Sequence, residues 1–166
     1  MGVNIALLTV TDTRTLETDK SGKILVDKIK KALHQLIDRK ICKDNKEDIK
    51  KILVEWTKLK DIDVIITTGG TGLTGRDITP EALDEIADKH IPGFGEVFRT
   101  ISLKTVGTSS IQSRACAALS NGKYIFALPG SSGGVTDAWD GILKHQLDIN
   151  HKPCNFVELF PRLKEK

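Results

Sequence analysis

The sequence predicts an α/β fold, a three-layer sandwich in which helices cover both faces of a mostly parallel central sheet. Short apolar segments alternate along the chain with longer amphipathic segments, which is the pattern of parallel strands joined by helices. At residues 62–66, β-branched residues predominate and only Asp63 is polar, as expected for a strand covered on both sides. The 166 residues are enough for one core, so we expect residues 1–166 to form a single domain.

The N-terminal half predicts two strands and two helices. Residues 3–10 form a short apolar run, expected to be the first buried strand, and residues 36–42 predict a weaker strand. Residues 21–36 and 44–59 repeat apolar side chains at helical spacing. The first helical stripe comprises Leu25, Ile29, Ala32, Leu33 and Leu36, and the second comprises Ile49, Ile52, Leu53 and Trp56. Asp44 or Asn45 is expected to cap the second helix.

The C-terminal half continues this alternation. After the strand at 62–66, Thr79-Pro80 predicts a helix start, with the threonine as N-cap and the proline in the first turn. Further helices are expected around residues 96–103, at 108–119 and at 135–147, with a strand at 124–128.

Composition excludes several functional classes. Lys and Arg total 25 against 22 acids, a net charge of +3 that is too small and too scattered for a nucleic-acid-binding surface. No stretch approaches the ~20 apolar residues of a membrane span, and residues 3–10 lack the features of a signal peptide. The three cysteines have no C-x-x-C spacing, which argues against a zinc site or disulfide scaffold. We expect a cytoplasmic protein with reduced thiols that binds neither nucleic acid nor membrane.

The most informative segment follows the strand at 62–66. It runs Thr67-Thr68-Gly69-Gly70-Thr71-Gly72-Leu73-Thr74-Gly75-Arg76-Asp77. Ligands bind at the carboxyl ends of parallel strands, and glycines allow phosphate oxygens to approach the backbone amides. The threonines add hydroxyl donors. The segment therefore predicts an anion-binding loop, with an ordinary ligand-free turn as the alternative.

Two familiar phosphate-binding motifs do not fit this loop. Residues 70–75 match G-x-G-x-x-G, but a dinucleotide fingerprint opens directly into a helix and needs a second strand ending in an acid about 20 residues later. Here the helix starts only at Thr79-Pro80, and residues 91–95 are Ile-Pro-Gly-Phe-Gly. A P-loop needs a lysine after its glycines, where this chain has Arg76-Asp77. A dinucleotide-binding domain is therefore the weakest alternative.

Acidic and polar residues are expected around the same loop. A carboxylate at Asp77 repels a phosphate unless a divalent cation lies between them, so Asp77 is a candidate Mg²⁺ ligand. A salt bridge to Arg76 or a helix cap is the alternative. In a parallel sheet, other strand ends place residues 11–14, Asp44 and residues 129–132 at the same edge. Residues 129–134 precede the last helix, where they could hold a second phosphate or form an ordinary turn.

Five blocks of the chain, at residues 67–72, 76–82, 92–99, 112–115 and 128–131, occur in an order and spacing that resemble the molybdenum cofactor biosynthesis protein B family, MoaB, and its relative MogA. Residues 146–148 and 153–156 resemble MoaB more than MogA. This resemblance implies the molybdopterin-binding, MogA-like form of the predicted α/β fold.

The resemblance also implies an activity, molybdopterin adenylyltransferase. Mg²⁺ and ATP would bind, the terminal phosphate of molybdopterin would attack the α-phosphorus, and adenylyl-molybdopterin and pyrophosphate would result. By motif, the nucleotide phosphates would be bound by Thr68, Gly69, Gly70, Thr71 and Gly72, with Asp77 and Asp44 as catalytic residues that hold Mg²⁺. The pterin would contact Asp12, Ser113, Pro129, Gly130 and Ser131, and Arg14 or Arg99 would stabilise phosphate charge.

A non-catalytic carrier or scaffold that binds molybdopterin is the alternative function. Family members thought to lack transferase activity have an altered Arg-Asp-Ile-Thr segment, which is intact here at residues 76–79. The resemblance departs at two positions, because the family often has glycine where Leu33 stands and proline where Ser132 stands. Family members form trimers or hexamers, so we expect a homo-oligomer, to which apolar residues of 153–163 could contribute contacts.

Overall fold

The fold is built on one six-stranded sheet. The computed structural model describes residues 2–165. The strands are β1 (Asn4–Val10), β2 (Gln35–Cys42), β3 (Val64–Thr68), β4 (Lys89–His90), β5 (Cys116–Ser120) and β6 (Lys123–Leu128), in the spatial order β2-β1-β3-β6-β5-β4. Neighbours among β2, β1, β3 and β6 are parallel, whereas β5 and β4 are antiparallel to their neighbours. The predicted mostly parallel sheet is confirmed.

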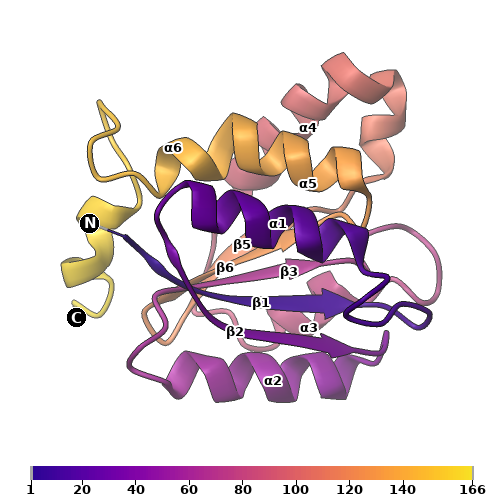
Figure 1. Cartoon of the computed structure of the whole chain (residues 1–166), viewed down its shortest axis with the longest axis horizontal. Helices are drawn as coiled ribbons and strands as arrows, with labels where there is room; N and C mark the ends of the chain where they lie inside the picture. Colours follow the sequence, from indigo (N-terminus) through magenta and orange to yellow (C-terminus); the bar gives the residue numbers. More distant parts are fainter. Residues whose placement is uncertain (1, 166) are drawn as a thin grey trace.

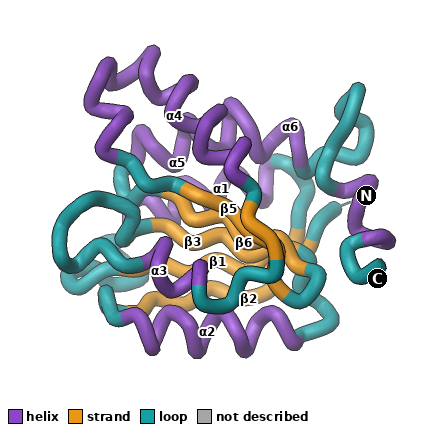
Figure 2. The backbone as a smooth tube through the Cα atoms, turned by 180° about the vertical axis from the view of Figure 1, so that it is seen from behind, coloured by secondary structure: helices purple, strands orange, loops and turns teal. Residues whose placement is uncertain are grey.

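Helices cover both faces of the sheet, which confirms the three-layer prediction (Figure 1). One face carries α1 (Lys20–Lys31), α4 (Pro92–Val106), α5 (Ser132–Ala138) and α6 (Lys144–Gln146), and the other carries α2 (Lys46–Lys58) and α3 (Thr79–Asp84). A π-helical stretch, η2 (Trp139–Leu143), joins α5 to α6, so the predicted helix at 135–147 is close to the observed helical run. The 3₁₀ helices η1 (Gly107–Gln112) and η3 (Val157–Arg162) complete the fold. Figure 2 shows the layers from behind, with α4 projecting from one corner.

Two apolar cores lie on the two sides of the sheet. Alternate strand residues point to opposite faces, so Ile66 packs under α1, α4 and α5 with Phe94 and Trp139, while Ile65 packs under α2 with Trp56. Trp56 is fully buried, as expected from its helical stripe, and its indole N–H donates to the Asp38 carboxylate at 2.9 Å. Strands buried on both faces explain why residues 62–66 lack polar alternation.

The predicted helix at residues 108–119 is wrong. Only η1 occupies its first part, and the remainder forms β5, which pairs with β6 through a hairpin. The hairpin turns at Asn121 and Gly122, which have φ angles of 48° and 72°, as a two-residue Asn-Gly turn requires. The alanines at 115, 117 and 118 favour a helix intrinsically, and pairing with β6 overrides that preference.

Two other local predictions need correction, and one open alternative is decided. The helix predicted at 21–36 ends at Lys31, so Leu36 lies in β2 and Leu33 is 84% exposed. Thr79 is the first helical residue of α3 rather than its N-cap. Of the two candidate caps for α2, the structure selects Asn45, whose side chain accepts from the amides of Glu47 and Asp48.

The C-terminal segment packs on its own chain. Phe156 and Phe160 lie against Tyr124, with ring centroids 4.7 and 5.6 Å apart. These two apolar side chains, proposed from the sequence as contacts to a neighbouring copy, therefore cover the chain's own core. No helix in residues 2–165 has the length and apolar character needed to cross a membrane.

Candidate functional site

A polar cavity of about 510 Å³ lies where the central parallel strands end. Its wall residues include those that follow β1, β3 and β6, and the arrowheads of β1 and β3 lie at the opposite end of the sheet from the two chain termini (Figure 1). Its walls are formed by Thr9, Val10, Thr11, Thr13, Arg14, Ser21, Asp44, Thr68, Gly69, Gly70, Thr71, Gly72, Arg76, Asp77, Gln112, Ser113, Pro129, Gly130 and Ser131. The polar strand ends thus form one hollow, at the edge where parallel α/β sheets bind ligands.

Two glycine-containing loops meet in this cavity, one after β3 and one after β6. A Cβ added to Gly130 would lie 3.2 Å from the Gly69 Cα, so the two backbones approach closely. The Gly69 amide donates to the Leu128 carbonyl at 3.0 Å, and the Thr68 hydroxyl donates to the Pro129 carbonyl at 2.8 Å. These contacts fix the spacing of the two loops.

The loop after β3 needs glycine at its turn. Gly69 and Gly70 have φ angles of 105° and 67°, in the left-handed region that glycine adopts without strain. Thr79 braces the turn, because its hydroxyl donates to the Gly69 carbonyl at 2.8 Å and its amide to the Gly70 carbonyl at 3.0 Å. Contact with the turn therefore replaces the capping role predicted for Thr79.

Asp77 is held in place by its own loop. Its Oδ2 accepts hydrogen bonds from the Thr74 amide at 2.9 Å and the Thr74 hydroxyl at 2.6 Å. Burial opposes ionisation of this carboxyl, but the bonds from Thr74, a bond from the Gly72 amide and the charge of Arg114 together lower its pKa. Asp77 therefore lies in the cavity wall as a stable carboxylate.

The pKa of Asp44 is shifted in the opposite direction to that of Asp77. Burial, and then the negative charge of Asp12, raise its pKa, and the charge of Asp77 adds to this effect. Asn45 caps α2, so the capping role is filled by its neighbour. Asp44 and Asp77 thus share one cavity with unfavourable mutual charge, which a bound cation would relieve.

Arg76 spans the mouth of the cavity to Asp12. Its Nε donates to Oδ2 at 3.0 Å, and its Nη2 donates to Oδ1 at 2.9 Å and to Oδ2 at 2.8 Å. The hydrogen bond from Arg76 is the main reason that the pKa of Asp12 is lowered. The sequence offered a salt bridge to Arg76 as an alternative role for Asp77, but in the structure Arg76 pairs with Asp12.

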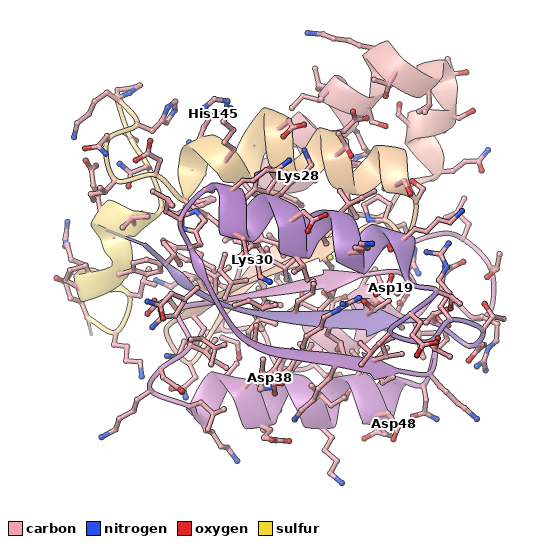
Figure 3. All side chains as sticks on the ribbon, viewed as in Figure 1. Asp19, Lys28, Lys30, Asp38, Asp48 and His145 are labelled. Atoms are coloured by element: carbon pink, nitrogen blue, oxygen red, sulfur yellow. The ribbon has the colours of Figure 1, made fainter. Side chains whose placement is uncertain are left out.

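A buried hydrogen-bond network around Asp19 supports the wall of the cavity at the start of α1. Asp19, labelled in Figure 3 at the start of α1, accepts from the Thr9 hydroxyl at 2.6 Å and from Arg39 at 3.0 Å. It also caps α1 by accepting from the Gly22 amide at 2.9 Å. The Arg14 guanidinium lies 3.4 Å from the Ser21 hydroxyl, which it can donate to. The network places Arg14 and Ser21 in the wall.

The structure brings together nearly all of the residues selected from sequence. Eleven of the twelve line the cavity, and only Asp12 stands at its mouth, held by Arg76. Arg99 does not line the cavity, because its guanidinium donates to the carbonyls of Ser113 and Ala115 at 3.3 and 3.1 Å.

Sequence reasoning expected residues 11–14 at this edge, but it gave no ligand role to five other wall residues: Thr9, Val10, Ser21, Arg76 and Gln112. The carboxyl end of the first strand, at Thr9-Val10, was a usable signal for the first two of them. For Ser21 the only signal was its place at the start of the helix predicted at 21–36, and the sequence did not show that this helix start faces the cavity.

Comparison with known proteins decides the family. The model of the probable molybdopterin-binding domain family matches residues 6–149. The chain belongs to this family of molybdenum cofactor biosynthesis proteins. It is 44% identical over 161 residues to molybdenum cofactor biosynthesis protein B of Escherichia coli K12, covering 97% of this chain and 93% of that one.

Solved structures agree with this assignment. A crystal structure of a molybdenum cofactor biosynthesis protein B superposes with a TM-score of 0.89 at 38% identity, covering 100% of this chain and 98% of the other. The tungsten cofactor synthesizing protein MoaB from Pyrococcus furiosus superposes with a TM-score of 0.77 at 34% identity, covering 87% and 92%. The likeness extends over the whole sheet and therefore includes the strand ends that form the cavity.

Proposed function

We propose that this chain transfers the adenylyl group of Mg-ATP to molybdopterin and releases pyrophosphate. The observation that supports this most directly is the presence of Asp44 and Asp77 in the same cavity as the glycine loop at residues 69–72. Backbone amides in such a loop attract phosphate, whereas two carboxylates beside it repel phosphate. This combination suits a phosphate group that arrives with a divalent cation.

The donor set fits Mg²⁺. Residues 2–165 contain no group of three or more His, Cys, Asp and Glu arranged to hold a metal ion by themselves. Mg²⁺ commonly takes one or two protein carboxylates and completes its shell with substrate phosphates and water, so Asp44 and Asp77 are sufficient protein ligands. When bound, Mg²⁺ would neutralise charge on the transferring phosphates.

The protein's own part in the reaction is positioning. The amides of residues 69–72 would hold the nucleotide phosphates, and the loop of Gly130 and Ser131 would hold the pterin phosphate. Because the Gly69 and Gly130 backbones are in contact, the two phosphates would be held side by side, which favours attack by one on the other. Arg14 and Arg76 also line the cavity and would stabilise the negative charge of the transition state.

No protein nucleophile is required. An oxygen of the pterin phosphate forms the new bond to the α-phosphorus, while the bond between the α-phosphorus and the bridging oxygen breaks and pyrophosphate leaves. A phosphate monoester has its second pKa near 6, so the attacking oxygen is already ionised at neutral pH. The cavity therefore needs to supply orientation and positive charge rather than a general base.

The test incubates the purified protein with molybdopterin, ATP and Mg²⁺, and follows pyrophosphate release and adenylylated pterin by chromatography. Asp77→Asn keeps the size of the side chain and should abolish turnover while leaving the fold and pterin binding largely intact. The matched control is Asp61→Asn, an exposed aspartate just before β3, at the opposite end of the strand from the cavity. This control should retain full turnover.

The alternative function, a molybdopterin carrier, gives a different result. A carrier binds the pterin but forms no product with ATP and Mg²⁺, and Asp77→Asn then alters only nucleotide affinity. Pterin binding without product in the unsubstituted protein would therefore overturn the transferase proposal.

We also propose that the chain assembles into a homo-oligomer, a trimer or a hexamer, in the cytoplasm. The projecting α4 and the adjoining η1 support self-association, because they leave Val97, Val106 and Ile111 between 50% and 77% exposed. The free thiols of Cys42, Cys116 and Cys154 are consistent with a reducing compartment. Light scattering on the purified protein measures the number of copies, and a monomeric mass would contradict the proposal. Cell fractionation tests the location.

A further inference from the structure

Arg114 does not line the cavity, yet it contacts the cavity wall at several points. Its Nε donates to the Gly72 carbonyl at 2.7 Å, and its Nη2 donates to the Asp77 carbonyl at 2.6 Å. Its backbone amide donates to the Thr71 carbonyl at 2.8 Å. One residue of the segment before β5 therefore binds both the beginning and the end of the loop that carries Asp77.

The position of the Asp77 carboxylate depends on both ends of the loop at residues 72–77. Thr74, in the middle of the loop, holds the Asp77 carboxylate through its amide and hydroxyl. The Asp77 amide in turn donates to the Thr74 carbonyl at 3.0 Å. These bonds set the carboxylate relative to the loop, but they do not set the loop relative to the sheet. Arg76 ties the side of the loop to Asp12 after β1, and the guanidinium of Arg114 binds the backbone at the two ends of the loop, next to Asp77 itself.

The loop lies close to the Asp77 carboxylate at Gly72 as well. A Cβ added to Gly72 would lie 2.8 Å from Asp77 Oδ2, so the carboxylate packs directly on the Gly72 backbone. Because Arg114 binds the carbonyl of Gly72, it fixes the surface against which the carboxylate rests. Movement of either Gly72 or the Asp77 backbone would move the proposed Mg²⁺ ligand.

Glu81 holds Arg114 in the required orientation. Its carboxylate on α3 forms an ion pair with the Arg114 guanidinium, through Nη1 and Nη2. The hydrogen bond from Arg114 lowers the pKa of Glu81, so the glutamate is charged at neutral pH. The Arg114 side chain is 32% exposed, and its planar fork of donors is used on three partners at once, which lysine cannot reproduce.

We propose that Arg114 is a positioning residue for Mg-nucleotide binding, and that it acts by holding the loop at residues 72–77 so that the Asp77 carboxylate faces the cavity. The inference rests on the proposed function for the identity of the ligand, and on the contacts above for the mechanism. Partners that orient a metal-binding carboxylate typically affect metal affinity or activity by ~10–100-fold when they are removed. The effect of Arg114 should fall on Mg-nucleotide binding and not on the pterin side of the cavity.

The test compares Arg114→Lys with the unsubstituted protein. Binding of ATP is measured by calorimetry over a series of Mg²⁺ concentrations, and molybdopterin binding is measured separately. We expect Arg114→Lys to weaken Mg-ATP binding ~10–100-fold, with pterin affinity and overall fold unchanged. If Arg114 had a merely structural role, Arg114→Lys would weaken the binding of both ligands together, or it would lower the melting temperature without changing the Mg²⁺ dependence of ATP binding.

Substitutions at two glutamates, Glu81 and Glu85, supply a test and its matched control. Glu81→Gln removes the partner of Arg114, while Glu85→Gln, four residues later, removes the partner of Lys46 and Lys50 on α2. Both substitutions break exposed ion pairs, but only Glu81 is connected to the loop. Glu81→Gln should weaken Mg-ATP binding less than Arg114→Lys does, because Arg114 keeps its carbonyl partners, and Glu85→Gln should not weaken it.

Amide hydrogen exchange separates this inference from the proposed function. Without any ligand, Arg114→Lys should speed the exchange of the Thr74 and Asp77 amides, and Glu85→Gln should not. If the unsubstituted protein fails to bind Mg-ATP, the proposed function fails, and exchange alone decides whether Arg114 holds the loop. If it binds Mg-ATP and Arg114→Lys binds equally well, the positioning role is overturned while the proposed function stands.

Discussion

Arg76 and Asp12 form a bidentate ion pair across the mouth of the cavity, with donor–acceptor distances of 2.8–3.0 Å. The two residues come from different loops, after β3 and after β1, and their side chains are 65% and 37% exposed. Such an exposed pair contributes little to folding. Because Arg76 lines the cavity, its guanidinium would be available to the phosphate of the proposed nucleotide.

The first prediction separates the two partners of this pair. Arg76→Gln should weaken Mg-ATP binding without changing the melting temperature, because it removes a cation from the cavity wall. Asp12→Asn should not weaken Mg-ATP binding, because it releases the guanidinium toward phosphate. Calorimetry on both variants measures the difference. Equal losses of Mg-ATP affinity in the two variants would instead mean that the ion pair itself, by holding the two loops together, supports binding.

The second prediction concerns the left-handed turn at Gly70. An added Cβ would overlap the Thr79 hydroxyl and lie 3.2 Å from Asp44 Oδ1, at a φ of 67°. Gly70→Ala should therefore destabilise the protein by at least ~1–2 kcal/mol from the backbone alone and weaken nucleotide binding. Gly75→Ala is the control in the same loop, since an added Cβ there meets nothing within 4 Å. Equal melting temperatures for Gly70→Ala and Gly75→Ala would show that the left-handed turn at Gly70 does not require glycine.

The sequence was sufficient to predict the cavity wherever the chemistry is local. Glycines, threonines and an acid that follow a buried strand indicate an anion site at that strand's end, and the structure places Gly69, Gly70 and Asp77 together there. The position of Arg114 could not be predicted in this way. It lies 42 residues from Gly72 in the chain, and no local pattern shows that a guanidinium will bind two distant carbonyls.

The fold shows the same division between local and long-range information. Alternating strands and helices were readable from periodicity, because each buried face imposes its own period. The strand β5 was not, because its alanines favour a helix and its pairing with β6 depends on a hairpin. The Asn121-Gly122 pair is the strongest local signal of that hairpin and would have corrected the assignment.

The third prediction is a pH dependence at Asp44. Burial, followed by the charge of Asp12, raises its pKa in the folded chain above the ordinary value of 3.8. The folded state then binds this proton more tightly than the unfolded state, so the ionised carboxylate lowers stability above the folded pKa. This cost diminishes as the pH falls through the folded pKa and is absent below 3.8.

Asp44→Asn removes that charge, so it should raise the melting temperature at pH 7 but not at about pH 3. Thermal unfolding at both pH values, with Asp61→Asn as the control, measures the effect. A gain of the same size at both pH values would show that charge is not its cause. Mg-ATP should stabilise the unsubstituted protein more than Asp44→Asn, because binding to the folded state alone raises stability.

The last prediction concerns the end of α1. Leu33 has a φ of 61°, and it occupies the position where a helix end of this type favours glycine. The Leu33 amide donates to the Lys30 carbonyl and the His34 amide to the Ile29 carbonyl, at 3.0 and 3.1 Å, which is the paired pattern of such an end. Leu33 is 84% exposed, so its side chain contributes little packing to offset the backbone strain.

Leu33→Gly should therefore stabilise the protein by up to ~1 kcal/mol, since relief of the left-handed strain exceeds the added flexibility of the unfolded chain. For a chain of this size the melting temperature should rise by ~2–4 °C. Leu33→Ala is the control, because alanine removes the exposed apolar side chain but keeps the Cβ that causes the strain. If alanine gives the same gain as glycine, the benefit comes from the lost side chain, and the strain at Leu33 is not what limits stability.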